Sequence, residues 1–348
     1  MDLLSFLRNS PSPYHAVDTA STLLLARGFT KLNDGEWKLK KGKYFYTGNG
    51  SSLIAFTVGS APSGVSIIGC HTDSPCLKLK PNQEAGAKVG VQTYGGGLWH
   101  TWFDRDLGLA GRIVLGSEKG IKSKLIKIDE PLMRIPTLAI HLDRNVKDGF
   151  VFNNETHLTP IGTELNIIKK IQASQNEEIL DFDLSLFDVN PPCLGGSDKE
   201  FIYSARLDNL LMSYCAIDAI LEAEVTDQVK LIALFDNEEV GSVSHSGADS
   251  SMLPNILDKI AKSFQSSVDS WAPNNFFLSA DCAHALHPNY TEKHEGSHQP
   301  QMGKGVVLKY NANQRYTTCG LSASIIKKLA QKVNCPLQVI QINFSRLL

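Results

Sequence analysis

The sequence of 348 residues contains no apolar run long enough to span a membrane. Charged residues make up 20% of it and the formal net charge is −2, so it lacks the basic excess that nucleic-acid binding requires. The first ten residues include Asp2 and Arg8 and do not resemble a signal peptide. We therefore expect a globular protein of the cytoplasm without nucleic-acid or membrane partners.

Cysteine and several common catalytic motifs are also scarce or missing. The seven cysteines are odd in number and never spaced as Cys-x-x-Cys, which argues against a disulfide framework and a thiolate zinc site. Neither His-Glu-x-x-His nor Gly-x-Ser-x-Gly occurs, so the single-zinc helix motif and the serine nucleophile elbow are absent. The triple glycine Gly95–Gly97 lacks the Lys-Ser/Thr of a phosphate-binding loop, and we interpret it as a tight backbone passage.

Helical and strand patterns alternate near both ends of the chain, which predicts an α/β fold. Its mostly parallel sheet would be flanked by helices, and the short strands between about residues 81 and 196 suggest an inserted or a second β-rich domain. We predict domain segments 1–80, 81–200 and 201–348. The expected helices are 14–27, 209–222 and 253–264, and the expected strands are 36–40, 43–47, 52–58, 65–70, 110–115, 124–128, 137–142, 201–203, 229–235 and 276–280.

Acidic residues or a histidine follow several of these strands, and the carboxyl ends of parallel strands share one edge of a sheet. One histidine with several carboxylates suits Zn²⁺, Mn²⁺ or Co²⁺, and a shared carboxylate could bridge two ions about 3.5–4 Å apart. Asp73 can accept the second ring N–H of His71. Any one of these residues alone fits a structural role better, but their repetition favours a metal hydrolase. The candidates are His71, Asp208, Asp236, Glu238, Glu239 and Asp281.

Four longer motifs then make the chain similar to a known family. They are HTDSP at 71–75, SARLDN at 204–209, DNEEVGS at 236–242 and SADCAH at 279–284. From about residue 10 to residue 338 the chain resembles the aspartyl aminopeptidases, a family of dizinc metalloaminopeptidases. The resemblance implies a zinc-exopeptidase-like catalytic domain and an inserted dimerisation domain.

The resemblance also implies roles for the candidate residues. Asp208 would bridge two Zn²⁺ ions, for which Mn²⁺ or Co²⁺ can substitute. His71 and Asp281 would complete the coordination of one ion, and Glu239 would hold the other. Glu238 would be the general base that deprotonates the bridging water, and we count Asp73, as the partner of His71, with the catalytic residues. The family further implies a cis peptide bond between Asp208 and Asn209.

The same resemblance implies a substrate and an assembly. Family members remove an N-terminal Asp or Glu from peptides, with Lys309 engaging the acidic side chain and His284 lining its pocket. His141 would reach the active site of a neighbouring subunit in a dodecamer built from dimers. From the residues alone, Lys309 is a surface lysine and His141 is a core histidine on a strand.

Family members continue beyond the segment that matches Gln338, to a histidine that is the remaining ligand of the second zinc. Here residues 339–348 contain no histidine. We therefore keep three hypotheses: an active aminopeptidase for acidic N-termini, a catalytically impaired relative, and a dimetal hydrolase acting on another amide such as an acylamino acid.

Overall fold

The computed structural model of the chain describes residues 1–82, 88–118, 120–162 and 167–341. Residues 342–348, which belong to the predicted segment without a histidine ligand, lie outside this range. The chain divides into two compact units, Met1–Asp281 and Cys282–Leu348, and each is described by itself.

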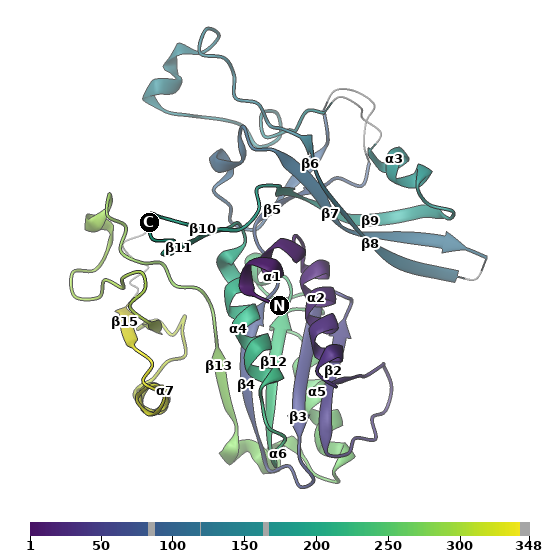
Figure 1. Ribbon diagram of the computed structural model, residues 1–348, viewed down its shortest axis with the longest axis vertical. Helices are drawn as coiled ribbons and strands as arrows, with labels where there is room; N and C mark the ends of the chain where they lie inside the picture. Colours follow the sequence, from purple (N-terminus) through teal and green to yellow (C-terminus); the bar gives the residue numbers. More distant parts are fainter. Residues whose placement is uncertain (83–87, 119, 163–166, 342–348) are drawn as a thin grey trace. The chain divides into compact units, whose positions relative to one another are not determined.

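A six-stranded sheet is the centre of the first unit (Figure 1). Strand β4 pairs in parallel with β12 and β13, and β1 pairs in parallel with β2, whereas β3 is antiparallel to both of its neighbours. The predicted mostly parallel sheet is thus confirmed. In spatial order the strands are β1 (Thr30–Lys31), β2 (Gly42–Gly48), β3 (Ser52–Val58), β12 (Gln228–Phe235), β4 (Gly64–His71) and β13 (Phe276–Ser279).

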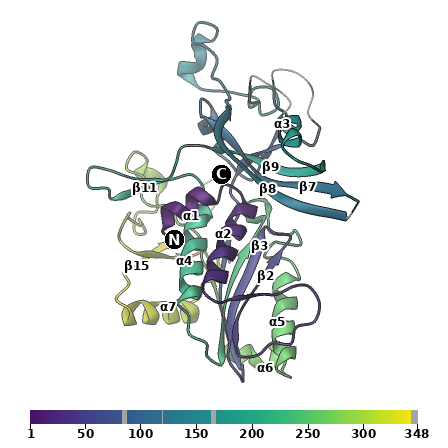
Figure 2. The ribbon, with the colours of Figure 1, turned by 45° about the vertical axis from the view of Figure 1, so that its right-hand side comes forward.

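Helices cover both faces of this sheet (Figure 2). Leu53 and Ala55 of β3 face one helical layer, whereas Ile54 and Phe56 face the other. Because the strands are buried on both faces, their sequences are continuous apolar runs. One layer consists of α1 (Leu3–Asn9), α2 (Pro13–Ala26) and α4 (Leu207–Leu221), and the other contains α5 (Met252–Ser263), α6 (Val268–Trp271) and the 3-10 turn η4 (Ala272–Asn274).

The ends of α2 follow the signals that predicted this helix. The side chain of Ser12 accepts a hydrogen bond from the backbone N–H of His15, and Pro13 occupies the first turn, where its missing N–H costs nothing. Beyond the helix, Gly28 has a φ of +78°, a conformation that glycine adopts without a steric penalty. The helix therefore begins and ends within one residue of the predicted range 14–27.

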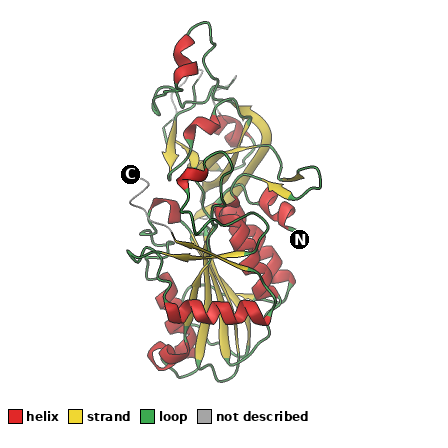
Figure 3. Cartoon of the chain, turned by 90° about the vertical axis from the view of Figure 1, so that its left-hand side faces the viewer, coloured by secondary structure: helices red, strands yellow, loops and turns green. Residues whose placement is uncertain are grey.

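The β-rich part of the first unit is a five-stranded antiparallel sheet with its own core, which includes Leu109, Ile113 and Leu184. Strands and loops dominate this region, with short helical segments only (Figure 3). The domain boundaries after residues 80 and 200 stay a prediction. The elements are β6 (Val91–Tyr94), β5 (Cys76–Leu79), β9 (Glu178–Asp188), β7 (Leu107–Ser117), β8 (Gly120–Met133), η1 (Trp99–Trp102), η2 (Arg144–Asp148) and α3 (Ile167–Ala173).

Two predicted strands are irregular in the structure, and a third is a strand but belongs to another sheet. Residues 36–40 are irregular, although Trp37 and Leu39 are buried as an alternating strand pattern suggests. Residues 137–142 are also irregular, and their alternating apolar side chains are exposed instead of lining a core. Strand β11 (Phe201–Tyr203) does not join the parallel sheet but forms an antiparallel ribbon with β10 (Cys193–Gly195).

In the second unit, β14 (Val306–Tyr310) and β15 (Leu337–Gln341) form a parallel pair. Parallel strands need a long crossover, and here α7 (Gly320–Lys332) lies in that connection. The 3-10 turn η5 (Thr291–Lys293) precedes them. Throughout the described ranges of both units, no helix combines the length and apolarity needed to cross a membrane.

Candidate active site

Three parallel strands of the large sheet end at one edge, as predicted. In the register of the sheet, Phe235 of β12 pairs with His71 of β4, and Ser279 of β13 pairs with Gly69. The backbone N–H of Ala280 continues this pairing by donating to the carbonyl of Gly69 over 2.8 Å. The chain therefore delivers the segments that follow these strands to the same place.

The first turn of α4 brings Asp208 to this edge. The Asn209 side-chain Nδ2 donates to the Ala280 carbonyl over 3.0 Å, and Ser74 Oγ donates to the Asp208 carbonyl over 2.6 Å. The peptide bond between Asp208 and Asn209 is cis, as the family resemblance implied. These bonds connect the start of α4 to the segments after β4 and β13.

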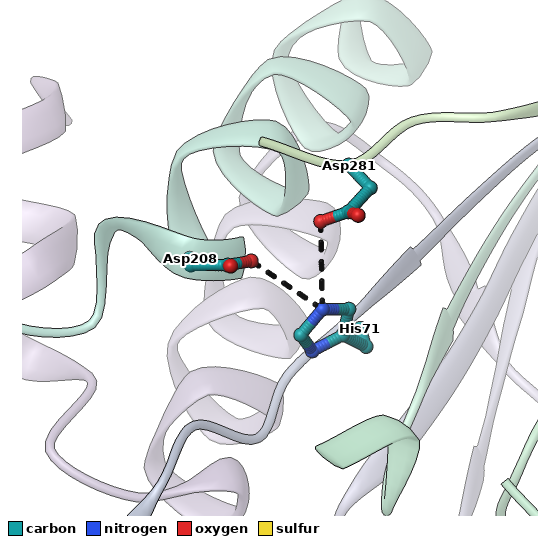
Figure 4. Close-up of side chains that lie close together, drawn as sticks. All are labelled: His71, Asp208 and Asp281. Carbon is teal, nitrogen blue, oxygen red and sulfur yellow. Dashed lines mark ion pairs between the residues drawn. The ribbon is translucent and has the colours of Figure 1, made fainter. Parts of the chain in front are cut away.

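His71, Asp208 and Asp281 converge at the edge (Figure 4). The Nε2 atom of His71 lies 3.6 Å from Asp208 Oδ1 and 3.8 Å from Asp281 Oδ1. Their ligand atoms all lie within 4.8 Å of one another, and among the described residues this is the group able to hold a metal ion. The imidazole is buried, whereas 59% of the Asp208 side chain and 38% of the Asp281 side chain are exposed.

The other ring nitrogen fixes the orientation of His71. Its Nδ1 lies 3.1 Å from the backbone carbonyl of Asp73 and 3.3 Å from the Asp73 carboxylate, the contact that the sequence predicted. Ser213 Oγ of α4 donates to the His71 carbonyl over 2.7 Å and holds the backbone. With Nδ1 occupied by acceptors, Nε2 is the nitrogen available to a metal.

The charges of the site favour a bound cation. Burial lowers the pKa of His71, but the carboxylates of Asp208, Asp281 and Asp73 outweigh this effect and raise that pKa to about 12. A proton on Nε2 is therefore stabilised by the surrounding negative charge, and a divalent ion can take its place. One imidazole with two oxygen ligands is a donor set that zinc accepts, so the residues fit the metal.

The acidic loop after β12 forms the 3-10 turn η3 (Glu238–Val240). Glu238 Oε2 lies 3.8 Å from His71 Nε2, so this carboxylate faces the cluster. Burial raises the pKa of Glu238 and raises that of Glu239 to about 7, and nearby carboxylates add to both shifts. Glu239 lies outside the three-residue group, and Asp236 is buried.

Sequence reasoning missed the role of Tyr94, at the end of β6. Its hydroxyl donates to Asp73 Oδ2 over 2.7 Å and accepts from Asn237 Nδ2 over 2.8 Å. Burial, together with the charge of Asp73, raises the pKa of Tyr94 and keeps the hydroxyl protonated. No pattern in the sequence pairs this tyrosine with Asp73.

Two of the predicted substrate residues, Lys309 and His284, belong to the second unit. Lys309 of β14, in the second unit, donates from Nζ to the Cys282 carbonyl over 2.7 Å. Burial, with the nearby charges of His294 and Lys309, lowers the pKa of His284 in the same unit. His141 is exposed in a turn, so its interpretation as a core residue on a strand was wrong. Its approach to a neighbouring subunit stays a prediction.

A cavity of about 710 Å³ lies beside Asp208. Ser74 and Thr72 of the segment after β4 line one part of it, and Trp102 and Ser185 of the β-rich region line another. The volume is in the range of small-molecule and short-peptide sites.

Known proteins are similar to this chain in sequence and in fold. A family model described as Aminopeptidase I zinc metalloprotease (M18) matches residues 6–346. The chain belongs to this family. The match extends beyond residues 10–338, the range of the resemblance that the motifs had indicated.

Individual relatives agree with the family. A probable aspartyl aminopeptidase of Ricinus communis is 41% identical over 97% of this chain and 82% of its own length. Ape4, in a cryo-EM structure of its complex with Nbr1, is 39% identical with a TM-score of 0.91 over 98% of this chain and 74% of that chain. The S. cerevisiae mApe1 dodecamer is 27% identical with a TM-score of 0.86, over 98% of this chain and 84% of its own. The predicted fold and the predicted class of zinc aminopeptidase are confirmed.

Proposed function

We propose that this M18 protein releases N-terminal Asp or Glu residues from peptides and uses two zinc ions to do so. The observation that carries the proposal is the convergence of His71, Asp208 and Asp281, with their ligand atoms within 4.8 Å of one another, next to the Glu238 carboxylate. His71 and Asp281 would hold one ion, Glu239 the other, and Asp208 both.

The residues of the site suit the hydrolysis of an amide. Bound zinc supplies Lewis acidity, which polarises a carbonyl and makes water easier to deprotonate. Glu238 takes the proton from the attacking water and gives it to the departing amine. Burial raises the pKa of Glu238 towards neutral pH, and a general base is most effective when its pKa lies near the working pH. Asp73 holds the His71 ring so that Nε2 stays directed at the cluster.

The acidic specificity rests on Lys309 and His284. A carboxylate leaving water needs a cationic partner, and the Lys309 ammonium supplies one. Burial, then the charges of His294 and Lys309, lower the pKa of His284 in the second unit. Within the first unit, the cavity beside Asp208 has room for a short peptide.

Oligomerisation belongs to the proposal. The mApe1 relative forms a dodecamer, and we extend a homo-oligomeric assembly to this chain, with the segment 81–200 as its dimerisation domain and 1–80 and 201–348 as the catalytic domain. His141 would act on a neighbouring subunit. Its loop exposes Leu138, Ile140 and Leu142, with exposed fractions of 58%, 51% and 75%, as a segment that packs against a partner would.

A reducing compartment such as the cytoplasm fits the cysteines. No disulfide joins the seven cysteines, all of which lie in the part of the chain that the structure describes, and Cys193, Cys215 and Cys319 are exposed. Exposed thiols persist where glutathione and thioredoxin keep them reduced. We therefore propose the cytoplasm as the compartment of this aminopeptidase.

Steady-state kinetics on Asp-, Glu-, Leu- and Lys-anilides test the proposed substrate, with N-acetyl-Asp as a probe of acylamino acid hydrolysis. We expect turnover of the Asp and Glu anilides only, and a large rise in their KM for Lys309→Met. Lys304→Met, a change at an exposed lysine, is the matched control. Equal turnover of the Leu anilide, or cleavage of N-acetyl-Asp instead, would refute the acidic specificity.

Metal analysis of the purified protein tests the two-ion part. Two zinc ions per subunit are expected after dialysis against a weak chelator. One ion per subunit, lost on substitution of His71 but retained on substitution of Glu239, would refute the second site and leave the first in place.

A further inference from the structure

We infer that Tyr94 is a positioning residue of the zinc site, through which the β-rich sheet holds Asp73 and the acidic loop in place. The inference rests on the proposed zinc site of this aminopeptidase but not on its preference for acidic substrates. It assigns part of the site to a sheet other than the one that carries the ligands.

The hydroxyl of Tyr94 connects two elements of the site. It donates to Asp73 Oδ2 over 2.7 Å, and it accepts from Asn237 Nδ2 over 2.8 Å. Donor and acceptor capacity of one hydroxyl are thus both used on residues that neighbour proposed ligands. No other hydroxyl among the described residues has a hydrogen bond to the Asp73 carboxylate.

Asp73 transmits the position of Tyr94 to three residues. Its Oδ1 accepts from the backbone N–H of Glu238 over 3.2 Å and lies 3.3 Å from His71 Nδ1. Its Oδ2 accepts from the backbone N–H of Glu239 over 3.1 Å. A rotation of this carboxylate would therefore disturb the imidazole and both glutamates at once.

Asn237 is the second residue that Tyr94 holds, and it directly precedes Glu238 in the acidic loop. Its backbone is left-handed, with a φ of 64°, which asparagine tolerates better than most residues. Its side chain is held from two sides, because Oδ1 accepts from Ser244 Oγ over 2.6 Å while Nδ2 donates to Tyr94. The tyrosine hydroxyl thus helps to set the turn that orients Glu238.

The β-rich sheet holds the Tyr94 ring in turn. The ammonium of Lys78, on the neighbouring strand β5, lies 3.9 Å from the ring centroid, a close cation–π contact. The next residue, Gly95, passes so close to the loop that a Cβ there would lie 3.0 Å from Glu239 Cβ. The end of β6 therefore packs directly against the residues that carry the chemistry.

A merely structural hydroxyl would behave differently from a positioning one. Loss of an ordinary part-buried hydrogen bond lowers stability modestly and leaves the chemistry unchanged. Loss of a hydrogen bond that orients metal ligands typically weakens metal affinity or activity by about 10- to 100-fold. Zinc affinity and kcat at saturating zinc distinguish the two cases.

The test compares Tyr94→Phe with Tyr46→Phe in the full chain. Tyr46 is a matched control, because its hydroxyl also donates to a carboxylate, that of Asp34 over 2.8 Å, away from the site. We expect Tyr94→Phe to weaken zinc binding, measured with a competing chelator, by about 10-fold or more and to lower kcat by a similar factor with KM little changed. Tyr46→Phe should alter neither.

A second variant approaches the contact from the loop. Asn237→Gly keeps the left-handed backbone but removes the amide, and its effect on zinc affinity should not add to that of Tyr94→Phe in the double variant. This variant keeps the inference testable if Tyr94→Phe folds poorly. Zinc affinity within about two-fold of wild type in either single variant, or full additivity in the double variant, would overturn it. Because zinc affinity is measured without substrate, failure on acidic anilides would count against the specificity alone.

Discussion

The Oε2 atom of Glu238 lies 3.8 Å from the Nε2 atom of His71. This separation exceeds a hydrogen bond, as does the equal separation of Asp281 from the same nitrogen, so Glu238 faces the group of candidate ligands without bonding to His71. The carboxylate is half exposed, which leaves it accessible to water. Together with the raised pKa of Glu238, this access to water suits a residue that moves a proton.

Glu238→Gln should therefore lower kcat by about 10²- to 10⁴-fold while zinc content stays at the wild-type level, because the amide keeps the shape but cannot accept the proton. Anilide hydrolysis and metal analysis on the same preparation measure both quantities. Glu36→Gln, at an exposed glutamate, is the control and should keep full activity. Loss of zinc in parallel with activity would make Glu238 a ligand instead.

His71→Asn should abolish the stabilisation that zinc gives to the folded chain. A ligand that binds only the native state adds about 2.7 kcal/mol at a concentration 100 times its Kd. Adding zinc to chelator-treated protein should raise Tm in the wild type and much less in the variant, as measured by differential scanning fluorimetry. His157→Asn, at an exposed histidine of the β-rich region, should respond like the wild type. An unchanged zinc response in His71→Asn would place the metal elsewhere.

The sequence was sufficient to predict the edge of the sheet where the site lies. Strands that are buried on both faces have continuous apolar sequences. The bounds of β4 and β12 were therefore predicted within about one residue at either end. The residues that follow them were then assigned to one edge because parallel strands share a direction. His71, Asp208 and Asp281 meet there in the structure.

Other features depend on contacts that no local pattern records. Trp37 and Leu39 alternate with polar residues as a strand would, yet they belong to no strand and are buried against one face of the sheet. Leu138 and Ile140 alternate in the same way and are exposed. The contact between Tyr94 and Asp73 joins two sheets across 21 positions of sequence, and a tyrosine at a strand end gives no sign of it.

His15 should make stability depend on pH. Burial lowers its pKa to about 4, below the 6.5 of an unfolded chain, so between these values the unfolded state binds more protons. Its contribution is fully present above pH 6.5 and is lost as pH falls towards 4. Between pH 7 and pH 5 we expect a loss of about 2 kcal/mol that His15→Asn does not show.

Urea unfolding of the metal-free wild type and of His15→Asn at both pH values measures this difference, since titration of His71 is common to both proteins. The Asn side chain can still bond with Ser12, whose Oγ lies 2.8 Å from His15 Nδ1. Parallel pH profiles for the two proteins would show that His15 titrates normally in the folded state.

Gly95 and Gly96 form a matched pair of neighbours with opposite expectations. Gly95 has a φ of +79°, and a Cβ there would lie 3.0 Å from Glu239 Cβ, whereas a Cβ on Gly96 would meet nothing within 4 Å. Gly95→Ala thus forces a strained backbone and pushes on the acidic loop, at a cost of roughly 1–3 kcal/mol in stability.

Because the loop carries Glu238 and Glu239, Gly95→Ala should also lower kcat, by about 10-fold or more, whereas Gly96→Ala should retain both stability and kcat. Urea unfolding and anilide kinetics on the two variants check this. A loss of stability in Gly95→Ala with full kcat would mean that the loop yields without moving its glutamates. If both variants lost stability and kcat equally, the cause would instead be the flexibility of the three consecutive glycines. A loss of stability confined to Gly95→Ala follows from the positive φ of Gly95 and from its close approach to Glu239, whereas a loss of kcat confined to it follows from the close approach.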